Sequence, residues 1–249
     1  MSMPSGNSPS IGNSSKSNKV MSTPHLVIFD CDGTLVDSQN AIVASMDFAF
    51  RAHGLEPPAR ADILSIVGLS LPRAVEALMP AHPVSLAAQV AETYKTGFGV
   101  TILDEAKRDP LFAGADLIIE KLAAGPDVML GIATGKSLRG VHRLLDREDW
   151  RAHFATIQTA DNAPSKPDPG MILQAMAETG AEPATTIMIG DTTYDIDMAR
   201  AAGVHAIGVA WGYHPVAALV TSGAHAIVED FTDLLRVVRA RMAARAVQR

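Results

Sequence analysis

Short apolar runs with the composition of buried β-strands recur along this chain. After residue 128 they alternate with segments whose apolar residues recur at helical spacing, and this alternation is typical of an open parallel α/β sheet. The helical segments of this part are Ser137–Leu145, Gly170–Thr179 and Tyr194–Ala202. The predicted strands are Leu26–Phe29, Val128–Ala133, Ala155–Gln158, Thr186–Ile189 and Ala206–Val209.

One long segment interrupts the alternation directly after the first predicted strand. From residue 39 to about residue 108 the pattern is helical, in Ala41–Ala52, Leu71–Leu78 and Leu86–Phe98, and prolines separate the helices. About 70 helical residues inserted after one strand predict a small second domain. We therefore divide the chain into a disordered leader or expression remnant at 1–22, an α/β core made of 23–38 and 109–249, and a helical domain at 39–108.

Composition is that of a globular protein, because 47% of the residues are hydrophobic and 19% are charged. The net charge of −6 disfavours nucleic acid and anionic membranes as partners. The single cysteine, Cys31, excludes a disulfide framework and a cysteine-rich zinc site. Residues 1–22 lack the apolar core of a signal peptide, and no apolar run is long enough to span a bilayer. We expect a cytoplasmic protein, either a monomer or a small homo-oligomer.

Two carboxylates stand directly after the first predicted strand, in the sequence Asp30-Cys31-Asp32-Gly33-Thr34. Asp30 and Asp32 are two residues apart, so on an extended backbone they share a face. Open α/β sheets bind their ligands at the carboxyl ends of the strands. Crowded carboxylates are costly there unless a cation neutralises them, which indicates a ligand-binding role beyond turn formation.

A second strand end also carries an aspartate. Asp191 follows the predicted strand Thr186–Ile189, and Asp195 falls in the first turn of the next helix, where helix capping alone would explain it. Asp30, Asp32 and Asp191 offer hard oxygen ligands, which suit a Mg²⁺ ion that also meets a phosphate group.

Two further polar elements complete the candidate site. Thr134 and Gly135 end the second predicted strand at the beginning of a helix, where backbone N–H groups attract anions. Lys166 lies between prolines in the sequence Ser165-Lys166-Pro167-Asp168-Pro169, so it has less freedom than a surface lysine.

These four elements, in this order, resemble the haloacid dehalogenase-like superfamily of aspartate-nucleophile hydrolases. The resemblance is closest to the phosphoglycolate phosphatase-like branch, and the helical insertion resembles the cap of that superfamily. It implies a Rossmann-like open parallel sheet with an inserted all-helical cap. It also implies a Mg²⁺-dependent phosphatase whose substrate is a small phosphorylated metabolite, with phosphoglycolate as the default of the branch.

The resemblance gives each matching residue a role. Asp30 would attack phosphorus and become an aspartyl-phosphate. Asp32 would protonate the leaving alcohol and then activate the water that hydrolyses the intermediate. Thr134 would hold a phosphoryl oxygen, and Lys166 would neutralise charge on the nucleophile and on the transferring group.

The resemblance also implies a metal-binding set. Asp30, Asp191 and the main-chain carbonyl of Asp32 would bind Mg²⁺, and Asp195 would support that set. The remaining supporting positions are Gly33, Thr34 and Gly135.

Other reactions of the same superfamily are less favoured by the residues. A dehalogenase needs neither the second carboxylate, Asp32, nor a metal ligand at Asp191. Sugar-phosphate mutases usually place an arginine just after a glycine resembling Gly68; Leu71 occupies that place here, although Arg73 is close. A mutase therefore stays the alternative function.

Unrelated classes fit less well. A receiver-like regulator that is merely phosphorylated would not need Asp32 or an insertion of about 70 residues. The segment from Gly131 to Ser137 is similar to a nucleotide-binding P-loop, but three residues separate its glycines where that motif requires four.

Substrate choice is expected to lie in the helical insertion, because the core contacts only the phosphate. The candidates are Ser70, Arg73, Tyr94 and Lys95. Arg73 or Lys95 could pair with a carboxylate or a second phosphate on the substrate. Sugar phosphates, nucleoside monophosphates and pyrophosphate stay open as substrates.

Overall fold

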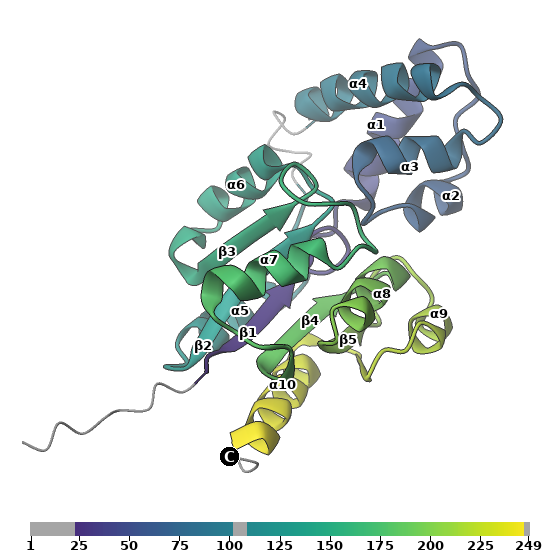
Figure 1. Cartoon of the computed structure of the whole chain (residues 1–249). Coiled ribbons are helices and arrows are strands. Elements are labelled where there is room, and N and C mark those ends of the chain that lie inside the picture. The colour runs from purple at the N-terminus through teal and green to yellow at the C-terminus, as the bar shows by residue number, and fades with distance from the viewer. Residues whose placement is uncertain (1–22, 102–108, 247–249) are drawn as a thin grey trace, which may run out of the picture.

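A computed structural model describes residues 23–101 and 109–246 of the chain (Figure 1). The leader predicted at 1–22 lies outside the described residues. Within the described part, no helix is long and apolar enough to cross a lipid bilayer.

Six parallel strands form one sheet in the order β3-β2-β1-β4-β5-β6. This arrangement confirms the predicted α/β class, and all five predicted strands are present. The last strand is missing from the prediction because its three residues are too short a run to stand out. The strands are β1 (His25–Phe29), β2 (Val128–Thr134), β3 (Phe154–Thr159), β4 (Thr186–Gly190), β5 (His205–Val209) and β6 (Ala226–Val228).

Helices cover both faces of the sheet. The helical pattern correctly predicts α6, α7 and α8 but misses α5 and α9. On one face lie α5 (Ala115–Ala123), α6 (Leu138–Arg147) and α10 (Phe231–Ala246); on the other lie α7 (Gly170–Thr179), α8 (Thr193–Ala201) and α9 (Val216–Thr221). Two short 3₁₀ helices, Arg151–His153 and Pro183–Thr185, precede β3 and β4.

The central strand β1 shows why the strands appear in the sequence as continuous apolar runs. Its residues Leu26 and Ile28 pack with α7 and α8, while Val27 and Phe29 pack with α5 and α6 on the opposite face. All four are fully buried. A strand that is covered on both faces has no solvated side that would call for polar residues.

The direction in which the chain winds reverses at β1, which lies between β2 and β4. From β1 the chain builds β2 and β3 on one side and then crosses to β4, β5 and β6 on the other. Such a reversal leaves a crevice at the carboxyl ends of the neighbouring strands, where open α/β sheets bind ligands.

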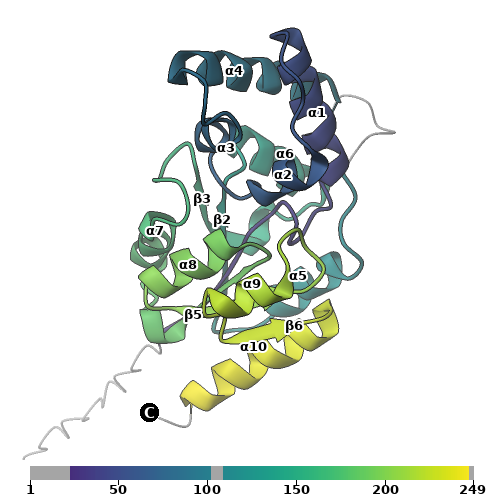
Figure 2. The same ribbon diagram turned by 90° about the vertical axis from the view of Figure 1, so that its right-hand side faces the viewer.

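The helical insertion consists of α1 (Gln39–Ala52), α2 (Arg60–Ser65), α3 (Leu71–Leu78) and α4 (Val84–Thr101). It lies over the carboxyl ends of the strands (Figures 1 and 2). Three of these helices match the prediction, and the short α2 does not appear in it. Because the insertion has a hydrophobic cluster of its own, we propose that it is the separate domain predicted at 39–108.

The connection between α2 and α3 is the part of the insertion that touches the core most closely. The backbone N–H of Ser70 donates to Ser165 Oγ over 2.8 Å. Tyr194 Oη donates to the carbonyl oxygen of Ser65 over 3.1 Å. Gly135, at the end of β2, lies so close to the carbonyl oxygen of Leu69 that a Cβ atom there would overlap it.

We predict that Gly135→Ala destabilises the protein, because the new methyl group collides with backbone rather than with a flexible side chain. Overpacking of this kind typically costs about 1–3 kcal/mol. Urea unfolding followed by circular dichroism measures the change. An unchanged free energy of unfolding would show that the insertion does not rest on Gly135.

Candidate active site

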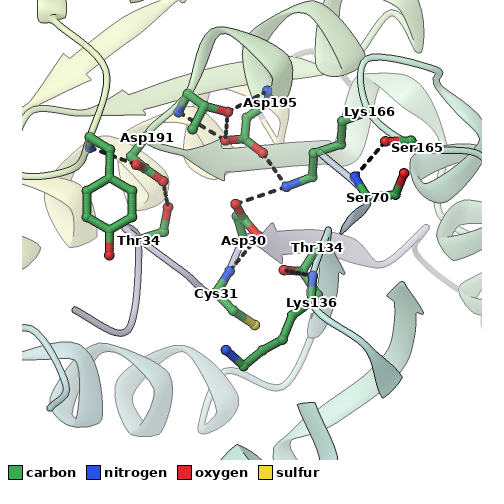
Figure 3. A network of polar contacts seen from close by, with 12 residues as sticks. Asp30, Cys31, Thr34, Ser70, Thr134, Lys136, Ser165, Lys166, Asp191 and Asp195 are labelled. Carbon is green, nitrogen blue, oxygen red and sulfur yellow. Dashed lines mark hydrogen bonds and ion pairs between the residues drawn. The ribbon is translucent and has the colours of Figure 1, made fainter. Parts of the chain in front are cut away.

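Buried polar residues meet at the carboxyl ends of β1, β2 and β4 (Figure 3). Asp30 follows β1, Thr134 ends β2, and Asp191 follows β4. Lys166 comes from the connection between β3 and α7, and Asp195 lies in the first turn of α8. All five residues are at least 99% buried, so water screens the charges of the three aspartates and of Lys166 only weakly.

Lys166 lies between two of the carboxylates. Its Nζ donates to Asp195 Oδ1 over 2.6 Å and lies 3.0 Å from Asp30 Oδ2. Burial alone would lower the pKa of Lys166, but the Asp195 and Asp30 carboxylates raise it above its usual value, so the ammonium form is held.

Asp30 carries an oxygen that no hydrogen bond satisfies. Its Oδ1 accepts from the backbone N–H of Cys31 over 2.7 Å, which fixes the carboxylate. Its Oδ2 is the one buried side-chain polar atom without a hydrogen bond among the described residues, since the approach of Lys166 lacks hydrogen-bond geometry. Burial raises the pKa of Asp30 to about 6, against the opposing effect of Lys166.

Asp191 is held by groups from two segments, the loop after β1 and the loop after β5. Its Oδ1 accepts from Thr34 Oγ1 and its Oδ2 from the backbone N–H of Tyr213, each over 2.9 Å. Gly33 has a φ of 85° and, with Gly212, leaves the space that the Asp191 carboxylate fills. Burial, followed by the charges of Asp195 and Asp30, raises the pKa of Asp191 well above its usual value.

Asp195 both caps α8 and binds Lys166, and the sequence indicates only the capping role. Its Oδ2 accepts from the hydroxyl of Thr192 over 2.7 Å and from the backbone N–H of Thr192 over 3.0 Å, which forms a capping box at the beginning of α8. Its Oδ1 accepts the hydrogen bond from Lys166. A side chain on Gly190 would collide with Asp195, so glycine is needed there.

The carboxylates fit a metal ion. Asp30, Asp191 and Asp195 each offer an oxygen, and these atoms lie within 4.8 Å of one another. Among the described residues, Lys166 is the one ammonium group that pairs with any of these acids, and it contacts Asp30 and Asp195. Asp30 Oδ2 has lone pairs to spare. A divalent cation would supply the missing positive charge, and carboxylate oxygens are the ligands that hard cations prefer.

The side chain of Asp32 lies outside this cluster. It accepts a hydrogen bond from Lys136 Nζ over 2.7 Å, and both side chains are mostly buried. The Lys136 ammonium also lies 5.5 Å from the centre of the Phe98 ring of α4. The sequence reasoning assigned no role to Lys136, although it directly follows Thr134 and Gly135.

Two further residues that support the site, Trp211 and Tyr213, lie in a loop without a recognisable motif, so the sequence does not predict their contacts. The backbone N–H of Tyr213 reaches Asp191, and Tyr213 Oη accepts from the backbone N–H of Ser38 over 3.0 Å. Trp211 Nε1 donates to the carbonyl oxygen of Thr34 over 3.0 Å. The loop after β5 therefore braces the loop after β1.

A cavity of about 790 Å³ opens from Asp30, Asp32 and Thr134 toward the helical insertion. Three of the four predicted substrate residues, Ser70, Tyr94 and Lys95, line it. The fourth, Arg73, is exposed to solvent and is not among the lining residues.

Comparison with known proteins agrees with this geometry. The family model for haloacid dehalogenase-like hydrolases matches residues 27–209. A Dickeya dadantii protein named "Probable phosphatase IndB" is 36% identical over 220 residues, which are 86% of this chain and 94% of that protein. A phosphoglycolate phosphatase from Photorhabdus laumondii is 27% identical over 225 residues, 88% of this chain and 94% of the relative. The crystal structure of a hydrolase from Pseudomonas syringae is 26% identical and superposes with a TM-score of 0.76 over 87% of this chain and 98% of that one.

We predict that a divalent cation stabilises the folded chain, because it relieves the repulsion among the three buried carboxylates. At a concentration 100 times its Kd, a ligand of the native state adds about 2.7 kcal/mol. Thermal melting in excess Mg²⁺ or Mn²⁺, compared with EDTA, measures the shift.

Asp191→Asn is expected to abolish this shift. Asp197→Asn is the matched control, since Asp197 lies on α8 but is exposed to solvent. Equal melting temperatures of the unchanged protein with and without the cations would exclude a metal site.

Proposed function

Because this chain belongs to the haloacid dehalogenase-like hydrolases, in their phosphoglycolate phosphatase-like branch, we propose that it is a Mg²⁺-dependent phosphatase that hydrolyses a small phosphate monoester. The observation that carries the proposal is the buried Asp30 Oδ2, which has no hydrogen bond and lies 3.0 Å from Lys166 Nζ. An oxygen in that position is free to form a bond.

Asp30 is the proposed nucleophile. Its Oδ1 is occupied by the Cys31 N–H, so Oδ2 forms the bond to phosphorus while the ester P–O bond breaks. Water then attacks the aspartyl-phosphate, which releases inorganic phosphate and restores the carboxylate. Lys166 is proposed to stabilise the negative charge of the transferring group. Its pKa, raised above the usual value, supports this because the side chain then stays an ammonium.

Thr134 and the metal complete the electrostatic support. The Thr134 hydroxyl lines the cavity and is proposed to hold a phosphoryl oxygen. Asp30, Asp191 and the main-chain carbonyl of Asp32 would hold Mg²⁺, with Asp195 in support. When bound, Mg²⁺ would neutralise negative charge on the phosphoryl group.

Asp32 is the proposed acid and base. An alkoxide is a poor leaving group, so the departing alcohol needs a proton, and the water of the second step needs a base. Asp32 lines the cavity beside Asp30, and its contact with Lys136 fixes where the carboxylate lies. A dehalogenase has no use for such a group, which favours phosphate-ester hydrolysis.

The mutase alternative receives less support. Arg73 was the one arginine close to the position that mutases use, and it does not line the cavity. Phosphoglycolate, the default substrate of the branch, carries a carboxylate besides its phosphate, so its recognition would require a positively charged group in the cavity.

We expect Asp30→Asn to fold normally and to lose turnover of any phosphate monoester by more than about 10⁴-fold, because an amide cannot form the acyl phosphate. Release of inorganic phosphate in the presence of Mg²⁺ measures the loss. Asp197→Asn, which changes an exposed acid of α8, is the control and should retain full activity. A folded Asp30→Asn protein with near-normal turnover would refute the mechanism.

A further inference from the structure

The cavity wall that the helical insertion contributes is mostly apolar, with Ser70, Lys95 and Thr96 as its polar members. The wall comes from α1, from the connection between α2 and α3, from the beginning of α3 and from α4, and its large apolar side chains include Ile42, Met46, Leu71, Tyr94 and Phe98. A volume of about 790 Å³ lies in the range of sites that enclose drug-sized ligands. A two-carbon alcohol such as glycolate would fill little of this space. Water would occupy the rest and keep the apolar side chains hydrated, which is unfavourable.

The two lysines at this wall, Lys95 and Lys136, are already paired. Lys95 is the single charged lining residue from the described part of the insertion, and its Nζ lies 2.6 Å from the carboxylate of Glu92. From the core, Lys136 donates to Asp32. A carboxylate on the substrate would therefore meet only paired lysines at the wall, and the cavity's remaining cations are the exposed arginines of α6.

Two arginines of α6 line the cavity from the core side. Arg139 and Arg143 are four residues apart, and both are exposed to solvent. Water screens exposed charges, so an anion gains little there compared with a buried pair. They form a solvated rim of the cavity. A substrate that carries a carboxylate would bind through it at this rim, which is the alternative to an apolar ligand at the wall.

The aromatic part of the wall is a stacked pair of rings. The rings of Tyr94 and Phe98 stack with their centres 5.7 Å apart and an angle of 18° between their planes. Such rings favour other rings as neighbours, and the flexible thioether of Met46 adapts to the shape of an apolar ligand.

From these contacts we propose that the substrate is a phosphate monoester of an alcohol that carries an apolar ring and no carboxylate. This inference rests on the proposed phosphatase function. The phosphoryl group passes to Asp30 and then to water, while the alcohol leaves with a proton and its ring stays against Tyr94 and Phe98 until release.

The test compares three alkyl phosphates with the full chain in Mg²⁺: 2-phenylethyl phosphate, ethyl phosphate and phosphoglycolate. All three leave as primary alkoxides, so each needs the acid. We expect kcat/KM for the phenylethyl ester to exceed the other two at least about 10-fold, mainly through a lower KM. Equal or better hydrolysis of phosphoglycolate would overturn the inference.

Tyr94→Leu and Phe98→Leu remove the rings but keep apolar volume. Each is expected to lower kcat/KM for the phenylethyl ester by about 3- to 10-fold, and to affect ethyl phosphate less. Phe48→Leu is the control, because Phe48 belongs to α1 and is half exposed and is not among the lining residues. Equal losses on both esters in the Tyr94 and Phe98 variants would overturn the inference.

The remaining outcomes distinguish the inferred substrate class from the proposed phosphatase function. If Arg139→Gln or Arg143→Gln abolishes a wild-type preference for phosphoglycolate, the α6 rim binds a carboxylate and the inference fails. Hydrolysis of all three esters without a preference also overturns the inference but leaves the phosphatase function standing. Absence of hydrolysis of every ester would overturn both.

Discussion

Three buried carboxylates beside one buried ammonium group are the constraint on which the site depends. Asp30 follows β1, whereas Asp191 and Asp195 both follow β4, and Lys166 reaches two of the three. Burial of like charges is costly, which is why the pKa values of Asp30 and Asp191 lie above their usual values. The arrangement is therefore suited to a divalent cation together with a phosphate group.

The fold supplies the geometry that this constraint requires. Parallel strands place their carboxyl ends at one edge, and the reversal at β1 opens a crevice there. The insertion after β1 then covers the crevice, with its α2–α3 connection resting on the core at Ser165. Under the proposed function, the core would act on the phosphoryl group and the insertion would recognise the alcohol.

Much of this could be predicted from the sequence, because the relevant signals are local. Apolar runs identify strands that are buried on both faces, and an aspartate after a strand lies at the ligand-binding edge, as Asp30 and Asp191 do. The missing parts depend on contacts between distant segments. No pattern indicates that Lys136 would bind Asp32, or that Tyr213 would reach Asp191 from the loop after β5.

The residues predicted to contact the substrate show the same limit of prediction from sequence. Ser70, Tyr94 and Lys95 line the cavity, whereas Arg73 does not, and only the packing of α3 against its neighbours decides which face of that helix is turned to solvent. Periodicity gives the apolar face of a helix but not which of the other faces borders a cavity.

The central claim is that Asp30 becomes covalently phosphorylated. The most direct measurement is acid quench of Asp32→Asn protein during turnover, followed by mass spectrometry of its peptides, since loss of the base should let the intermediate accumulate. The account predicts one added phosphoryl group on the peptide that contains Asp30, and none when Asp30 is replaced by Asn. A phosphoryl group on another residue, or turnover with no phosphorylated peptide at any time point, would contradict it.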